Sequence, residues 1–293
     1  MSDVKPLLIA GATGYGAWPA NSLEGARHCL AAATDGIEID VQITADGHVV
    51  AHHDYRLNPD QTRLDGAWIE AAGAPLKTLG LEALRRYDIG RLRPGSDYAA
   101  RYPGREPMDG VGIPTMRELL AAMKAAPGPR RLLYVEIKTD PLDPESAPAP
   151  RAIVEAVFAD LEAEDYLAHA KIIAFDWQVL RLSRDRHADI RTAHLTIPAA
   201  LSARIQPAPD GRSPWTDGSD ARDHDGSELA AIKAHGGMEW SPYFTDVTEA
   251  SMAEAKAQGL LVGPWGLSKG EDIRRMAELG VYSSTVSGVD WGL

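Results

Sequence analysis

Two short segments combine acidic and basic side chains at a spacing that suits a metal ion. Glu38 and Asp40 lie two residues apart in the apolar run Ile37–Ile43, and Glu136 and Lys138 repeat this spacing in a second run. Residues i and i+2 of a strand point to the same face, and neighbouring carboxylates repel each other unless a cation lies between them. We therefore expect Glu38, Asp40 and Glu136 to bind a hard cation, Mg²⁺ or Ca²⁺. The alternative is a structural network of ion pairs.

A lysine and a histidine complete this group of side chains. Lys138 places a positive charge on the face of Glu136, where an oxygen of an anionic ligand can bind. His53 ends a third apolar run and is followed by an aspartate. A histidine at a strand end beside a metal site is a candidate general acid or base near neutral pH. Its alternative role is that of a surface histidine held by its neighbour.

A hairpin is expected to bring the histidine to the acids. The turn Thr44–Gly47 joins the runs Ile37–Ile43 and His48–His53, and it ends in Asp-Gly, which favours a tight turn. A turn centred on its middle peptide bond places His53 opposite Glu38.

Apolar, β-rich runs alternate with helix-like segments along the chain. The expected strands are Leu7–Ala10, Ile37–Ile43, His48–His53, Leu132–Ile137, Lys171–Phe175, Ile190–Leu195, Met238–Trp240, Leu261–Trp265 and Val281–Val286. The expected helices are Ser22–Ala33, Met116–Ala125, Ala152–Glu164, Gln178–Asp185, Glu228–His235, Thr248–Gln258 and Gly270–Leu279. This alternation indicates a parallel α/β fold. We predict a single domain over residues 1–293, a (β/α)8 TIM barrel in which the ninth run forms the hairpin.

The segment 55–113 interrupts the alternation. It contains many turn residues, as in Arg93-Pro94-Gly95 and Tyr102-Pro103-Gly104, but no run that would form a barrel strand. Long irregular segments in compact domains are more often functional than accidental. We interpret this segment as an insertion after the hairpin that lies over the mouth of the barrel.

Charge and composition limit the classes of partner. The chain carries 42 acidic and 30 basic residues, a formal net charge of −12, which argues against a nucleic-acid partner. The single cysteine excludes an internal disulfide. The first apolar run is too short for a signal peptide, and no segment has the length of a membrane span, so we expect a cytoplasmic protein. The sequence does not determine the oligomeric state.

One segment closely resembles a known family. Residues Asp35–Asp54, which contain the expected hairpin, are similar to the core signature of the glycerophosphodiester phosphodiesterases. Further similarities lie in Ile113-Pro114-Thr115, Val135–Lys138, Phe175-Asp176, Trp240-Ser241-Pro242, Val262–Trp265 and Glu278–Val281. The resemblance spans nearly the whole chain. It implies a (β/α)-barrel hydrolase that cuts a small phosphodiester into a phosphomonoester and an alcohol.

The resemblance also implies roles for the residues above. Glu38, Asp40 and Glu136 would bind Mg²⁺ or Ca²⁺, and Lys138 would hold a phosphate oxygen. His53 would be one of two catalytic histidines, the one that protonates the leaving alkoxide. Trp265 would form an aromatic wall of the pocket, with core packing as its alternative.

The first strand departs from the family pattern. The family has His-Arg-Gly at its end and a Pro-Glu-Asn-Thr block later, whereas this chain has Gly11 and Ala12 in place of the histidine and arginine, and Ala20 in place of the glutamate. Loss of a general acid–base group typically costs about 10²–10⁴ in rate. Tyr15 and Trp18 fall where the lost groups were and would make the mouth more aromatic.

One other histidine is a candidate for the missing base. His194 lies near the end of the expected strand Ile190–Leu195, and the carboxyl ends of barrel strands form the active face. The alternative is a histidine packed under a loop.

Three functions remain open at this stage. The first is metal-dependent hydrolysis of glycerophosphodiesters or a related small phosphodiester. The second is altered chemistry, either internal attack by a substrate hydroxyl that gives a cyclic phosphate or the use of a non-phosphate substrate. The third is a non-catalytic binding barrel, against which the retention of Glu38, Asp40, His53, Glu136 and Lys138 argues.

Overall fold

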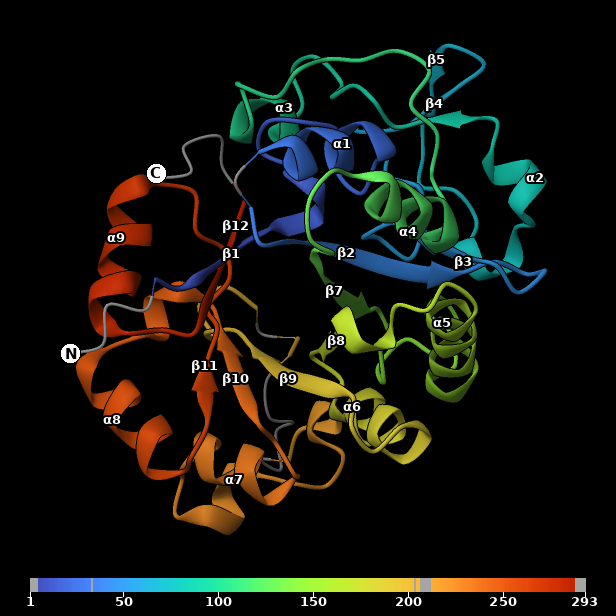
Figure 1. Cartoon of the computed structure of the whole chain (residues 1–293). Coiled ribbons are helices and arrows are strands. Elements are labelled where there is room, and N and C mark those ends of the chain that lie inside the picture. Colours follow the sequence, from blue (N-terminus) through green and yellow to red (C-terminus); the bar gives the residue numbers. More distant parts are fainter. Residues whose placement is uncertain (1–4, 33, 203, 206–211, 288–293) are drawn as a thin grey trace.

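A barrel of eight parallel strands forms the centre of the computed structural model, which describes residues 5–32, 34–202, 204–205 and 212–287 (Figure 1). In spatial order the strands are β11 (Leu261–Val262), β10 (Glu239–Pro242), β9 (Arg191–Thr196), β8 (Ala170–Ala174), β7 (Leu132–Ile137), β2 (Gly36–Ile43), β1 (Leu7–Ala10) and β12 (Ser283–Val286). The Tyr282 N–H donates to the Val262 carbonyl at 2.8 Å and links the last strand to β11. The predicted (β/α)8 barrel is confirmed.

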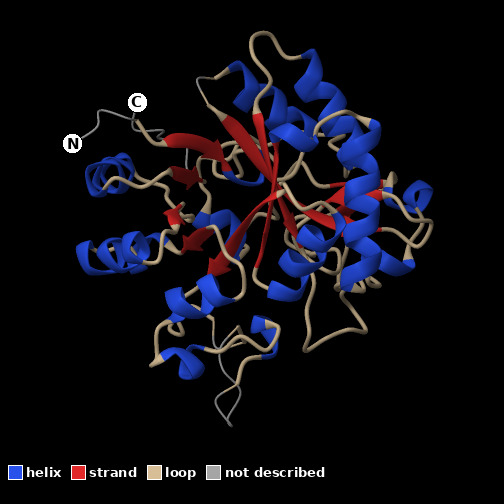
Figure 2. Ribbon diagram, turned by 60° about the horizontal axis from the view of Figure 1, so that its bottom comes forward, coloured by secondary structure: helices blue, strands red, loops and turns tan. Residues whose placement is uncertain are grey.

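Helices surround the strands on the outside (Figure 2). They are α1 (Leu23–Ala31), α4 (Met116–Ala125), α5 (Pro150–Ala163), α6 (Trp177–Arg186), α7 (Glu228–Ala234), α8 (Glu249–Ala257) and α9 (Gly270–Leu279). Short 3-10 turns are η1 (Gly11–Thr13), η2 (Leu76–Thr78), η3 (Leu167–His169), η4 (Pro214–Thr216), η5 (Ala221–His224) and η6 (Phe244–Asp246). All seven helices were expected to within a few residues; Ala33, the expected end of the first, lies outside the described residues. Caps fix several starts, such as the capping box of Thr115 and Glu118 at α4.

Alternation along the strands divides apolar from polar side chains. Ile37, Ile39 and Val41 of β2 pack outward into the core between barrel and helices. Because successive residues of a strand point to opposite faces, Glu38 and Asp40 point into the barrel. A smaller apolar cluster fills the interior and consists of Ile9, Tyr134, Ile173, Ala193 and Leu195.

The hairpin strand β3 (Val49–Ala51) pairs antiparallel with β2, but one residue away from the expected register. Val41 pairs with Ala51, and the His52 N–H donates to the Asp40 carbonyl at 2.9 Å. The expected pairing of His53 with Glu38 is therefore wrong. A three-residue loop ending in Gly47, at φ 84°, replaces the symmetric turn, and its extra residue shifts the pairing by one.

Residues 55–113 form a small unit beside the barrel. It contains the antiparallel strands β4 (Arg63–Leu64), β5 (Ala67–Trp68) and β6 (Tyr87–Asp88), with helices α2 (Leu81–Leu84) and α3 (Asp97–Arg101). A cluster of buried apolar side chains joins it to the hairpin: Val50, Leu57, Leu76, Leu84, Ile89, Val111 and Ile113. Within the described residues, no helix is long and apolar enough to cross a membrane.

Candidate active site

Three carboxylates converge at the carboxyl end of two neighbouring strands. Glu38 and Asp40 come from β2 and Glu136 from β7, where Asp40 and Glu136 are register partners. One oxygen from each side chain lies within 4.8 Å of the other two. Glu38 and Asp40 are buried, at 6% and 3% exposure. The fold therefore collects the three acids that the sequence singled out.

The electrostatics of this acidic cluster suit a cation. Burial, together with the negative charges of Asp40 and Glu136, raises the pKa of Glu38 well above its usual value. Burial also raises the pKa of Glu136. The Oε1 atom of Glu38 is buried and has no hydrogen-bond partner. A buried oxygen without a donor, in a group of carboxylates that repel one another, is what a hard divalent cation stabilises, so the residues fit a metal ion.

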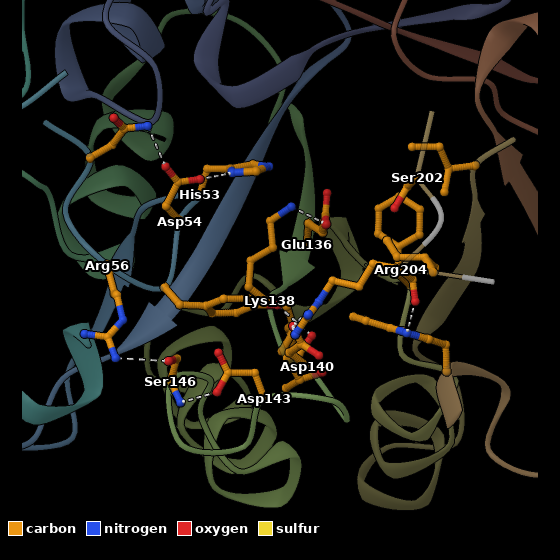
Figure 3. Close-up of a pocket in the computed structure, with 18 of the residues that line it drawn as sticks. His53, Asp54, Arg56, Glu136, Lys138, Asp140, Asp143, Ser146, Ser202 and Arg204 are labelled. Carbon is orange, nitrogen blue, oxygen red and sulfur yellow. Dashed lines mark hydrogen bonds and ion pairs between the residues drawn. The ribbon is translucent and has the colours of Figure 1, made fainter. Parts of the chain in front are cut away.

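Lys138 lies directly against Glu136 (Figure 3) and also contacts Asp40. Its Nζ atom is 2.8 Å from Asp40 Oδ1 and also pairs with Glu136 Oε1. Burial lowers the pKa of Lys138, but the two carboxylates outweigh it and hold the pKa above its usual value. Conversely, burial alone would raise the pKa of Asp40, whereas Lys138 brings it below its usual value. The ammonium therefore stays charged next to the cluster.

The loop after β1 holds two of the acids from the other side. The Asn21 amide donates to Asp40 Oδ2 at 2.8 Å, and the Asp40 N–H donates back to Asn21 Oδ1 at 3.0 Å. The Ala12 N–H donates to Glu38 Oε2 at 2.6 Å. Ala12, Thr13 and Asn21 have φ values of 40°, 58° and 53°, which are strained for side-chain-bearing residues. Asn21 was not predicted as a site residue, although its place in the Pro19–Ser22 block was a signal for it.

His53 follows β3 and is oriented by its neighbour. Its Nδ1 atom lies 2.7 Å from Asp54 Oδ1, and the Asn58 amide donates to the other oxygen of Asp54 at 3.1 Å. This contact leaves Nε2 as the ring nitrogen for other partners. The ammonium of Lys138 lowers the pKa of His53, but Asp40 and Asp54 outweigh it and raise the pKa above its usual value. The imidazole side chain is 62% exposed.

Two cavities meet at this group of residues. A larger one of about 670 Å³ extends along Lys138, Asp140 and Arg204, and Figure 3 shows it. A smaller one of about 270 Å³ lies over the loop after β1. His53, Glu136 and Trp265 line both cavities. Glu136 and His53 therefore lie where the two cavities meet.

Comparison with protein families gives a match over residues 11–285 to the glycerophosphoryl diester phosphodiesterase family. The chain belongs to this family. The glycerophosphodiester phosphodiesterase of Caldanaerobacter subterraneus is 24% identical to it over 284 residues, 95% of this chain and 92% of that protein. Family membership and the relatives indicate a phosphoric diester hydrolase.

Solved structures agree with the family assignment. A Silicibacter pomeroyi protein assigned to the glycerophosphoryl diester phosphodiesterases has 29% identity and a TM-score of 0.83, covering 99% of this chain and 92% of that chain. An Oleispira antarctica phosphodiesterase, solved with the product sn-glycerol-3-phosphate, has the same fold at 16% identity and a TM-score of 0.67, covering 97% and 93%. Members of the family generally depend on a divalent metal ion, and the acidic cluster is present here.

The positions at which the resemblance implies a departure from the family pattern lie in the smaller cavity. Gly11, Ala12 and Ala20 all line it, as do Tyr15 and Trp265, two of the expected wall residues. Gly11 is closely packed: an added Cβ would lie 3.2 Å from Thr285 Cγ2 and 3.4 Å from a carbonyl oxygen. A side chain at this position would therefore require a small shift of the Thr285 side chain.

Two expected site residues lie elsewhere. His194 of β9 is fully buried on the outward face, where its Nε2 atom is 3.0 Å from His235 Nδ1 and its ring packs edge-on against Trp177. Its neighbours Ala193 and Leu195 take the interior positions. This geometry excludes His194 as the replacement base. Trp18 lines neither cavity and stacks on the ring of His28, with ring centres 3.7 Å apart.

The segment 55–113 contributes residues that sequence reasoning missed. Tyr98, Arg101, Tyr102 and Arg105 line the smaller cavity. The Arg105 Nε–H donates to the Tyr15 carbonyl at 2.7 Å and so ties this segment to the loop after β1. The sequence could not predict that these residues line the cavity, because an irregular segment has no periodicity that shows which way its side chains point.

Proposed function

We propose that this protein hydrolyses glycerophosphodiesters, or a related small phosphodiester, to a phosphomonoester and an alcohol in a reaction that depends on Mg²⁺ or Ca²⁺. The observation that carries the proposal is the acidic cluster, with its unpartnered Glu38 oxygen, on the same cavities as the oriented His53. Glu38, Asp40 and Glu136 are the proposed metal ligands. A bound divalent cation would neutralise charge that develops on the phosphoryl oxygens.

We assign the remaining charges to the phosphate and the leaving group. Lys138 is the proposed ligand of a phosphate oxygen, since its ammonium is fixed beside the cluster and faces the larger cavity. His53 is the proposed general acid. Its raised pKa favours the protonated ring, and Asp54 holds Nδ1 so that Nε2 can give its proton to the leaving alkoxide.

A second candidate reaction arises from the missing base. Besides His53 and the three acids, the polar lining of the smaller cavity consists of hydroxyl, amide and guanidinium groups. None of these is a general base like the histidine that Gly11 replaces. A hydroxyl of the substrate itself needs less activation than water, because its effective concentration near the phosphorus is high. Internal attack to give a cyclic phosphate is therefore the alternative.

Product analysis tests both reactions. Glycerophosphocholine and an aryl phosphodiester are incubated with the protein in Mg²⁺, in Ca²⁺ and with chelator, and phosphorus NMR identifies the products. Metal-dependent release of glycerol phosphate, lost in His53→Ala, supports hydrolysis. Accumulation of a cyclic phosphate as the final product would instead support internal attack by a substrate hydroxyl. Absence of turnover on both substrates with either metal would reject the proposed function.

A further inference from the structure

We propose that Arg105, from the segment 55–113, is the phosphate-binding arginine of this site and takes over the role of the cation that Ala12 lacks. The inference rests on the proposed function, because it assigns a ligand to the same site. It makes the segment 55–113 a source of substrate-binding groups and not only a cover of the barrel.

The position of Arg105 supports this role. Its Nε–H donates to the Tyr15 carbonyl, and the next residue, Glu106, donates its N–H to the Ala17 carbonyl at 2.8 Å. These two bonds fasten the segment to the loop that begins at Gly11. Arg105, Ala12, Glu38 and Asp40 line the same cavity of about 270 Å³. A basic residue of the insertion therefore lines the same cavity as Ala12.

The charge of Arg105 is buried without a counter-ion. The residue is 9% exposed, and among the described residues no carboxylate oxygen lies within 4.0 Å of its guanidinium. Its other hydrogen bond among the described residues is a long one, 3.4 Å from Nη1 to the neutral Gln61 Oε1. Burial lowers the pKa of Arg105. Arg63 in the same segment is the contrast, since it is partly buried and pairs with both Asp88 and Asp109.

A buried cation without an anion is costly, and an anionic ligand would remove that cost. The bonds of Arg105 use the Nε–H and one N–H of Nη1, which leaves the second N–H of Nη1 and both N–H groups of Nη2 for a ligand. The Tyr102 ring, 5.2 Å from the guanidinium carbon, supports it from one side. A planar guanidinium held in this way matches two oxygens of a phosphate. The competing explanation is that Arg105 only clamps the segment to the loop.

Binding of inorganic phosphate and of sn-glycerol 3-phosphate separates the two explanations without relying on turnover. Calorimetric titrations of the Mg²⁺-loaded protein are compared for wild type, Arg105→Gln, Arg105→Lys and Arg63→Gln. We expect Arg105→Gln to weaken both ligands roughly 10- to 100-fold, and Arg105→Lys to lose less, because it keeps the charge but not the fork. Arg63→Gln breaks an ion pair of the same segment outside both cavities, so it should lower the unfolding temperature and leave the affinities unchanged.

Each result decides one question. Unchanged phosphate affinity in Arg105→Gln, with a lower unfolding temperature, would make Arg105 a clamp and overturn the inference. Should Arg105→Gln fail to fold, Arg105→Lys decides, since wild-type affinity in that variant would also overturn it. Arg105-dependent phosphate binding without hydrolysis of any diester would preserve the inference and reject the proposed function. If the protein hydrolyses a diester and Arg105→Gln leaves the KM unchanged, the proposed function stands and the inference about Arg105 is rejected.

Discussion

Asn21 and Asp40 exchange two hydrogen bonds, from the Asn21 amide to Asp40 Oδ2 and from the Asp40 N–H to Asn21 Oδ1. The pair joins the loop after β1 to β2 and fixes the orientation of one proposed metal ligand. Because Asn21 adopts a left-handed conformation, its backbone and its side chain contribute separately, and substitution can distinguish them.

Replacing Asn21 with glycine should weaken metal binding while keeping the loop conformation. Glycine tolerates a φ of 53°, so the change removes the amide without adding strain. Loss of a group that orients a ligand typically costs about 10- to 100-fold in metal affinity. Titration with Ca²⁺ or Mg²⁺ measures the effect. Asp65→Gly, at a similar φ in an exposed turn, is the matched control, and an equal loss of affinity there would contradict the orienting role.

His53→Gln should reduce turnover in proportion to the need for a general acid. With glycerophosphocholine, whose alkoxide leaving group requires a proton, we expect a loss of about 10²–10⁴ in kcat. An aryl phosphodiester leaves as a stable phenolate, so its loss should be much smaller. Steady-state rates on both substrates measure the ratio, with the exposed His48→Gln on the same hairpin as control. Equal losses on the two substrates would exclude His53 as the acid.

Glu38→Gln should separate the stability of the protein from its metal affinity. The pKa of Glu38 is raised by burial and by Asp40 and Glu136, so the charged side chain is a source of repulsion. A neutral glutamine should leave the unfolding temperature of the metal-free protein unchanged or higher and abolish its rise with Mg²⁺ or Ca²⁺. Differential scanning fluorimetry checks both, beside the exposed Glu145→Gln. A preserved rise in Glu38→Gln would count against Glu38 as a ligand.

Asp176 should make stability fall as the pH rises from about 4 to 6. Burial raises its pKa to about 6 despite bonds from Thr139 and the Gln178 N–H, and the charges of Asp217 and Asp140 add to the rise. The folded protein then binds a proton that the unfolded chain, near pKa 3.9, has lost, so protonation stabilises the fold in this window.

Unfolding by urea at pH 4 and at pH 6.5 tests this dependence. Asp176→Asn removes the titrating group. The free energy of unfolding of this variant, relative to that of wild type, should therefore be about 2–3 kcal/mol higher at pH 6.5 than at pH 4. Asp225→Asn in an exposed turn is the control. A constant difference between wild type and Asp176→Asn would rule out the raised pKa.

Periodicity in the sequence predicted much of this fold for physical reasons. β2 reads as alternating apolar and polar residues, and that alternation alone points Glu38 and Asp40 into the barrel. It could not predict the hairpin register, which depends on the left-handed Gly47. The same alternation misplaces His194, because Thr192, His194 and Thr196 alternate with Ala193 and Leu195 in β9, yet here the apolar residues face the interior and the polar ones face outward. The position of Arg105 could not be predicted from the sequence, since only tertiary contacts bring it to the site.

The two hydrogen bonds from Arg105 and Glu106 to the carbonyls of Tyr15 and Ala17 have a consequence for protein engineering. Excising residues 55–113 to obtain a minimal barrel would expose the apolar surface of Val50, which packs against this segment. It would also release the loop whose Ala12 N–H holds Glu38. A shortened chain of this kind would retain all three acids in sequence and lose their alignment in space. We therefore expect that a barrel trimmed of this segment would not bind a metal ion as the full chain does.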